Sequence, residues 1–192
     1  AGMLANNENN GAGYTDDYFP NNYAYIRKAW LVYENIDKVA DMSDRDKAIV
    51  KAEMQVLVAF RYVEMLKRYG GVPLVESTLT TVDVRPRSTV QQTLDFIVGL
   101  CDAAAATLEG VRWPADWLGR VNKGVALAVK AEALMYAARP LFNADAPYMQ
   151  MADPANNEMI WLGGYDAKRW ETARLANQEV IDWGKANGFE LI

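Results

Sequence analysis

The chain has 192 residues, and 51% of them are hydrophobic, which is enough material for a sizeable buried core. Its 20 Lys and Arg against 25 Asp and Glu give a net charge of −5, and no basic stripe follows any predicted helix, so nucleic acid is disfavoured as a partner. The chain has no His and only one Cys, Cys101, which excludes imidazole catalysis, disulfide frameworks and Cys-based metal clusters. We therefore expect no catalytic residue, no cofactor and no metal.

The first part of the chain is predicted to be irregular, and a helix follows it. Residues 1–21 are rich in Asn, Gly and Tyr and show no sustained period. Apolar residues then recur at intervals of three and four from about residue 23 to residue 39, with Asn21 or Asn22 as the helix cap.

The clearest helical pattern begins at Ser43, which has an acidic residue three positions later, as in a capping box. Its apolar residues occupy more than one side, which predicts a helix buried between neighbours on both sides. Gly70 and Gly71 are expected to end it as a left-handed C-cap, before an extended segment at 72–75. A phosphate-binding loop is disfavoured, because these glycines follow a helix and precede Pro73.

Three further helices are predicted downstream. A capping box at Ser88 to Gln91 starts a helix that ends near residue 108, and Cys101 lies on its apolar stripe as a small buried residue. An Ala-rich helix spans about 122–141, and a last helix spans about 167–185 and ends at Gly184 and Gly188. Residues 110–119 and 143–164 are predicted to be irregular loops.

These elements predict an all-α fold of stacked antiparallel helix pairs with long irregular loops. We expect a single helical domain over residues 1–192, in which an irregular segment (1–21) precedes a helical array (22–192). Helix pairs would begin near residues 22, 88 and 167, which is no fixed repeat length. The longest apolar stretch, residues 125–138, contains Lys130 and Glu132 and is too short to span a bilayer.

Four segments resemble the SusD/RagB family in order and spacing. They are AEMQVLVAFRYVEMLKRYGGVPLV (52–75), RPRSTVQQTLDFIVGLCDAAAATL (85–108), GRVNKGVALAVKAEALMYAARPLFN (119–143) and WETARLANQEVIDWGKANGFEL (170–191). Members often have Arg-Phe-Leu-Arg-Ala-Tyr where this chain has residues 55–60. Val58 therefore stands where an exposed charge is expected.

The resemblance implies a fold, a function and a location. It implies tetratricopeptide-like helix pairs in an outer-membrane protein that binds nutrients, glycans or peptides, and presents them to a TonB-dependent transporter. It further implies a protein that is not an enzyme, is much longer than this chain, faces outward and touches the membrane only through a lipid anchor outside these residues. The alternative is a helical-repeat scaffold for protein interactions with no role in nutrient uptake.

Aromatic residues in loops are the candidate ligand contacts. Trp and Tyr rings stack on the apolar faces of sugars, while Asn, Asp and Arg bind the hydroxyls. The candidates are Tyr14 and Tyr18 before the first helix, and Trp113 and Trp117 around Pro114. The alternative interpretation is that these rings only seal loops onto the helical core.

Two other kinds of site are disfavoured. Residues 6–17 have the ligand spacing of a calcium loop in a degenerate form, with Asp17 where Glu is usual. A glycosidase would need two carboxyls facing each other across a cleft, and Asp16, Asp17, Asp102 and Asp116 lie on or near loops.

Overall fold

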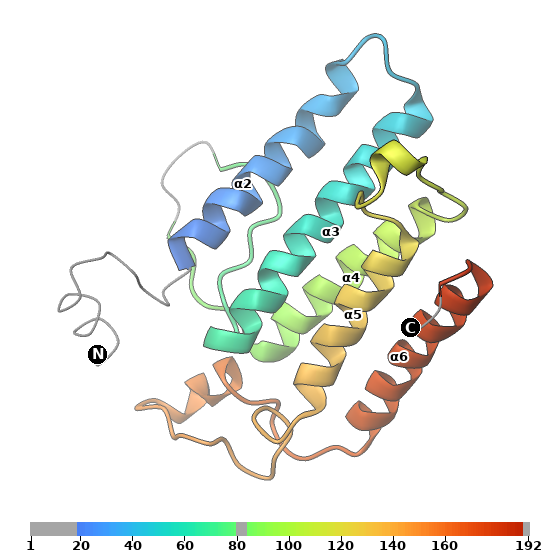
Figure 1. The fold of residues 1–192 in the computed structure, drawn as a ribbon. Coiled ribbons are helices and arrows are strands. Elements are labelled where there is room, and N and C mark those ends of the chain that lie inside the picture. Colours follow the sequence, from blue (N-terminus) through green and yellow to red (C-terminus); the bar gives the residue numbers. More distant parts are fainter. Residues whose placement is uncertain (1–18, 80–83, 190–192) are drawn as a thin grey trace, which may run out of the picture.

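A computed structural model describes residues 19–79 and 84–189, and within these ranges it is all-helical with no strand, which confirms the predicted fold class (Figure 1). Its helices are α2 (Phe19–Asn35), α3 (Asp44–Tyr69), α4 (Val90–Thr107), α5 (Lys123–Ala138) and α6 (Lys168–Ala186). Short 3-10 turns lie at η1 (Ile36–Lys38), η2 (Ala115–Trp117) and η3 (Pro154–Met159). No described helix is both long enough and apolar enough to span a bilayer.

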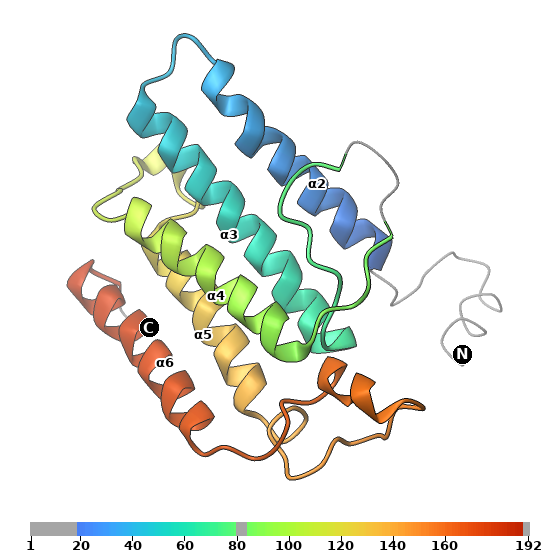
Figure 2. The ribbon, with the colours of Figure 1, turned by 180° about the vertical axis from the view of Figure 1, so that it is seen from behind.

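Consecutive helices pack against each other from α2 to α6, and α3 also contacts α5. They run side by side in alternating directions, as the two opposite views show (Figures 1 and 2). This alternation brings the α2–α3 loop, the α4–α5 loop and the end of α6 to the same end of the array. Three segments that are far apart in the sequence therefore meet there.

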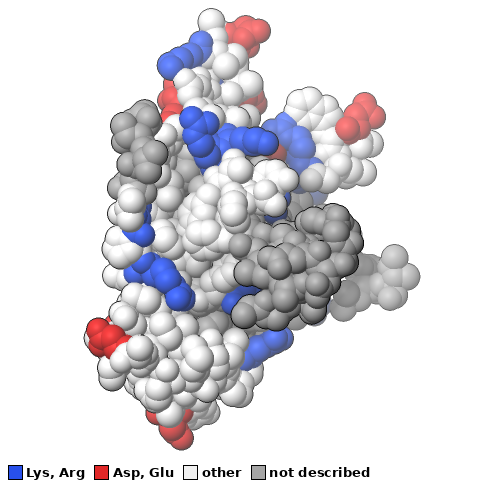
Figure 3. Space-filling model, turned by 90° about the vertical axis from the view of Figure 1, so that its left-hand side faces the viewer, with Lys and Arg blue, Asp and Glu red and all other residues white. Residues whose placement is uncertain are grey.

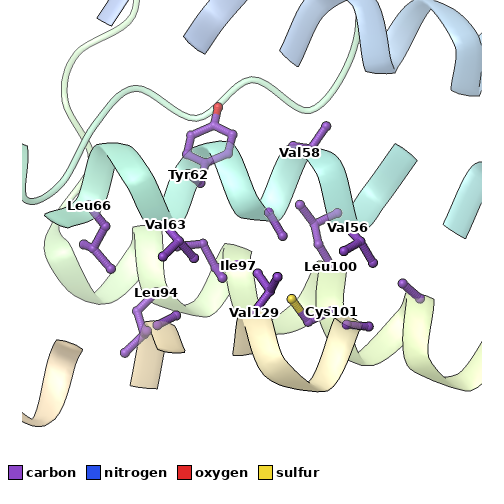
Figure 4. Packing of buried hydrophobic residues seen from close by; sticks show 14 of the residues in the cluster. Val56, Val58, Tyr62, Val63, Leu66, Leu94, Ile97, Leu100, Cys101 and Val129 are labelled. Atoms are coloured by element: carbon purple, nitrogen blue, oxygen red, sulfur yellow. The ribbon is translucent and has the colours of Figure 1, made fainter. Parts of the chain in front are cut away.

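Helix α3 is buried on two sides, as its apolar pattern predicts. Val56, Val63 and Leu66 point toward α4, whereas Val58 and Tyr62 point the other way (Figure 4). The Tyr62 hydroxyl accepts a hydrogen bond from Val75 N–H at 2.8 Å and thereby fixes the extended segment that follows the helix.

Val58 is fully buried, so the expectation that it replaces an exposed charge is wrong. A charged residue at this position would lose its solvation, which is costly unless a buried partner compensates for it. Cys101 on α4 is also fully buried, as predicted, and burial raises the pKa of its thiol to about 12.

Several predicted helix ends are displaced. Helix α2 begins at Phe19, four residues earlier than expected, because Pro20 is tolerated in a first turn. Asn21 and Asn22 are therefore inside the helix, which ends at Asn35 and gives way to η1. Helix α5 ends at residue 138 and not near 141.

Two of the predicted caps differ in detail. The N-cap of α4 is Thr89 and not Ser88, because Thr89 forms the full capping box with Gln92. Ser43 caps α3 as predicted and accepts a hydrogen bond from Asp46 N–H at 3.1 Å. Gly70 follows α3 with a φ of 75° but a ψ of −135°, so its positive φ was predicted correctly and its left-handed helical conformation was not.

Candidate functional site

Trp113 and Trp117 lie together at the end of the array where the three segments meet. Their ring centroids are 6.0 Å apart with an interplanar angle of 25°, so the rings are stacked. Trp113 is partly buried, and its indole N–H donates to Val121 O at 2.9 Å. Trp117, on η2, is 51% exposed, so about half of this side chain is accessible.

Arg120 is the third member of this cluster. Its guanidinium carbon lies 3.8 Å from the centroid of the Trp113 ring and 4.5 Å from that of Trp117, which are cation–π distances. We call Trp113, Trp117 and Arg120 the Trp–Arg cluster. It places one flat cationic group and two aromatic rings next to each other.

Glu53, on α3, holds the Trp–Arg cluster in place. Its carboxylate accepts two hydrogen bonds from Arg120, one of them from Nε at 2.9 Å and the other from Nη2. Glu53 is 7% exposed, and its hydrogen bond raises the pKa of Arg120 further above its usual value. The fork of the guanidinium therefore has a fixed orientation.

Sequence reasoning missed both Glu53 and Arg120 as functional residues. Glu53 lies four residues after Ile49 and three before Val56, both on the buried stripe of α3. An acidic residue on a buried helical face needs a partner, and this was the available signal. The partner is 67 residues away, and nothing in the spacing predicts it.

A cavity of about 390 Å³ opens beside the Trp–Arg cluster, within the volume range of small-ligand sites. Its other wall comes from the α2–α3 loop and the start of α3. That wall carries the carboxylates of Asp41 and Asp46 together with Met42, Ile49 and Val50. Aromatic faces, carboxylates and a guanidinium around one cavity are the groups that recognise a sugar ring and its hydroxyls.

None of the other candidates that fall within the described residues lines this cavity. Tyr14, Tyr18 and the possible calcium loop at 6–17 lie outside the described residues. Of the acidic residues considered for hydrolysis, Asp102 pairs with Lys130 at 2.7 Å, and Asp116 is exposed on η2. Within the described ranges, no group of three or more acidic or Cys side chains is placed to hold a metal ion.

A shallow groove of about 220 Å³ between α2 and α3 has a different character. Val32 and Leu57, which are 41% and 44% exposed, form its apolar part. Lys28 and Arg61 lie 5.3 Å and 4.3 Å from the centroid of the Tyr25 ring, and neither has an ion pair among the described residues. Figure 3 views the molecule from the α2 side, where Lys and Arg are prominent although the whole chain is acidic.

A hollow of about 460 Å³ between α5 and α6 is larger but less suited to a sugar. Tyr136 is its only aromatic residue, and Lys67 and Arg139 lie over that ring at 5.3 Å and 4.4 Å from its centroid. Volume alone therefore does not select the site, and the Trp–Arg cluster remains the best candidate.

Comparisons with known proteins concern the family and the fold of the chain. A model of the SusD-like family, described as "Starch-binding associating with outer membrane", matches residues 2–138. None of the curated proteins matches this chain.

The chain is similar to several solved structures. A protein named BT4246 is 30% identical with a TM-score of 0.77, over 90% of this chain and 30% of its own length. A SusD-like protein of Bacteroides fragilis, BF3747, is 32% identical with a TM-score of 0.59, over 65% of this chain and 24% of its own. A structure solved with a xylogluco-oligosaccharide is 22% identical over 83% of this chain and 28% of its own, with a TM-score of 0.61, and it supports the fold alone.

The chain thus spans about a third or less of the length of these structures. The family model covers well over half of the chain, and the helical array has the same arrangement as these structures. The chain belongs to the SusD-like family.

Proposed function

We propose that the intact protein captures glycans at the outer membrane for a partner TonB-dependent transporter, and that it is a binding protein and not an enzyme. The observation that carries this proposal is the Trp–Arg cluster beside the 390 Å³ cavity in a chain of this family. Support comes from the family itself, whose description names starch binding and association with the outer membrane.

The chemistry of binding follows from the cavity walls. The exposed ring of Trp117 stacks on the C–H face of a sugar, which removes apolar surface of both groups from water. Two of the five N–H groups of Arg120 donate to Glu53, and the others can donate to the hydroxyl oxygens of a sugar. On the opposite wall of the cavity, the carboxylates of Asp41 and Asp46 accept hydrogen bonds from the hydroxyl groups of the sugar. Such binding orients a glycan without making or breaking a covalent bond.

The finer parts of the proposal concern location and partner. The description of the family already gives an association with the outer membrane. We propose that a lipid anchor holds the intact protein on the outward face, and that the helical array forms part of the contact with the transporter. Tyr14 and Tyr18 stay in the proposal as further ligand contacts, since they lie in an Asn- and Asp-rich stretch of the sequence.

Isothermal titration calorimetry of the intact protein against a panel of oligosaccharides, including xyloglucan fragments, tests this function. Trp117→Ala should raise the Kd at least about 10-fold, since losing a stacked ring costs about 1.4 kcal/mol or more. Trp170→Ala is the matched control, because Trp170 is 40% exposed at the start of α6, at the other end of the array. Equal effects of the two variants, or no binding of any glycan, would contradict the proposal.

One observation favours the alternative, a helical-repeat scaffold with no nutrient role. The groove between α2 and α3 combines exposed apolar residues with two cations, Lys28 and Arg61, that form no ion pair within the described part of the chain, and such a surface suits an acidic, partly apolar protein segment. Under this alternative, Leu57→Asp with Arg61→Glu would abolish binding of a protein partner, while no glycan would bind to the unaltered protein.

A further inference from the structure

A second cavity, of about 400 Å³, lies on the other side of the Trp–Arg cluster. Trp113 and Arg120 border both cavities and form their shared wall. The far wall comes from the end of α6, which the alternating topology brings to this end of the array. The two cavities are therefore neighbours, with Trp113 and Arg120 between them.

The far wall carries a second pair of stacked rings. Trp183 and Phe189 have ring centroids 5.5 Å apart and an interplanar angle of 25°. This geometry is close to that of Trp113 and Trp117, which have the same interplanar angle. Among the described residues Phe189 is 58% exposed, and one face of its ring lies on Trp183.

The backbone at the end of α6 fixes Phe189 against Trp183. Gly188 has a φ of 79°, and Phe189 N–H donates to Gly184 O at 2.9 Å while Gly188 N–H donates to Lys185 O at 3.3 Å. These two hydrogen bonds are those of a Schellman motif, in which the residue after the glycine packs back onto the last turn of the helix. The backbone of Phe189 is thus fixed, and its ring packs on Trp183 in the last turns of α6.

Gly124 fixes Trp183 from the other side. A Cβ on Gly124 would lie 2.1 Å from an atom of the Trp183 ring, so only glycine at the start of α5 permits this close approach. Both rings of the second pair are therefore preorganised, which lowers the entropy lost on binding.

Polar groups lie between the two pairs of rings. Arg112 is exposed and donates from Nη2 to Asn187 Oδ1 at 3.3 Å, which leaves most of its N–H groups for other acceptors. Together with Arg120 and Asn187, it surrounds the second cavity with hydrogen-bonding groups. Alternating ring faces and hydrogen-bond donors suit a chain of sugar units, in which each unit offers an apolar face and a rim of hydroxyls.

We infer that the Trp183–Phe189 pair is a second sugar subsite, continuous with the Trp–Arg cluster, so that the preferred ligand is an oligosaccharide chain long enough to cross both cavities. The inference rests on the proposed function and extends it to the length of the ligand. A short ligand occupies the cavity beside Trp117 alone, whereas a longer chain also stacks on Phe189. Affinity should therefore rise with chain length, and this rise should depend on Phe189.

The test uses the intact protein and a size ladder, from disaccharide to octasaccharide, of whichever glycan binds most tightly in a glycan array. Phe189→Ala should weaken binding of the long oligosaccharides about 3- to 10-fold and leave that of the disaccharide unchanged. Trp117→Ala should weaken binding at every length. Tyr148→Ala, which removes a ring that is 62% exposed in the loop after α5, is the control and should change nothing.

The two proposals fail in different ways in this experiment. If Trp117→Ala weakens binding while Phe189→Ala has no effect at any length, the second subsite is wrong and the proposed function stands. If the protein binds no glycan in the array, both are wrong. Thermal denaturation of Phe189→Ala serves as the folding control, and a variant that is folded and still binds long chains as tightly as the unaltered protein overturns the inference.

Discussion

At the scale of single residues, the ion pair between Glu53 and Arg120 is the feature on which the site depends. The carboxylate of Glu53 is almost completely buried, while Arg120 lies over the two tryptophan rings. Removal of one partner would leave the other charge in a poorly solvated place, which costs more than the pair contributes as a whole. The pair therefore links the stability of the fold to the geometry of the ligand cavity.

This link makes a prediction for Arg120→Met. The substitution leaves Glu53 without its partner and should lower the free energy of unfolding by about 2–3 kcal/mol, measured by urea denaturation near pH 7. Arg174→Met is the control, since the pair of Arg174 with Glu171 is exposed on α6 and its loss should be barely detectable. If both variants lose the same stability, the special role given to Glu53 and Arg120 is wrong.

At the scale of helices, the sequence predicted which elements form better than where they end. Apolar residues at intervals of three and four are a direct consequence of burial on one helical face, and all five described helices follow this pattern. The ends depend on competition between nearby caps. The N-cap of α4 is Thr89 and not Ser88, because the side chains of Thr89 and Gln92 satisfy two backbone N–H groups at once.

Two helical glycines, Gly124 and Gly99, should respond in opposite ways to substitution by alanine. Gly124→Ala should destabilise the protein by about 1–3 kcal/mol, because the added Cβ would overlap the Trp183 ring. Gly99→Ala, in the middle of α4, meets no atom within 4 Å and should stabilise the protein by about 0.5–1 kcal/mol. Thermal denaturation of both variants checks this, and a stabilising effect of Gly124→Ala would contradict the packing of Trp183 described here.

At the scale of the whole molecule, the candidate site depends on the order and direction in which the helices stack. Trp113 and Trp117 could be proposed from the sequence because they are loop aromatics, although such rings also seal loops onto a core. Their surroundings could not, because Glu53, Asp46 and Phe189 reach them only through the alternating direction of five helices. Pattern and propensity are local properties, whereas contacts between residues 67 positions apart depend on how the helices stack.

The most direct test of the account is a crystal structure of the intact protein with a bound oligosaccharide. We predict a sugar ring stacked on the indole of Trp117, with Arg120 in contact with its hydroxyls and still paired with Glu53. An oligosaccharide bound elsewhere, with the face of Trp117 covered by another part of the protein, would contradict the account.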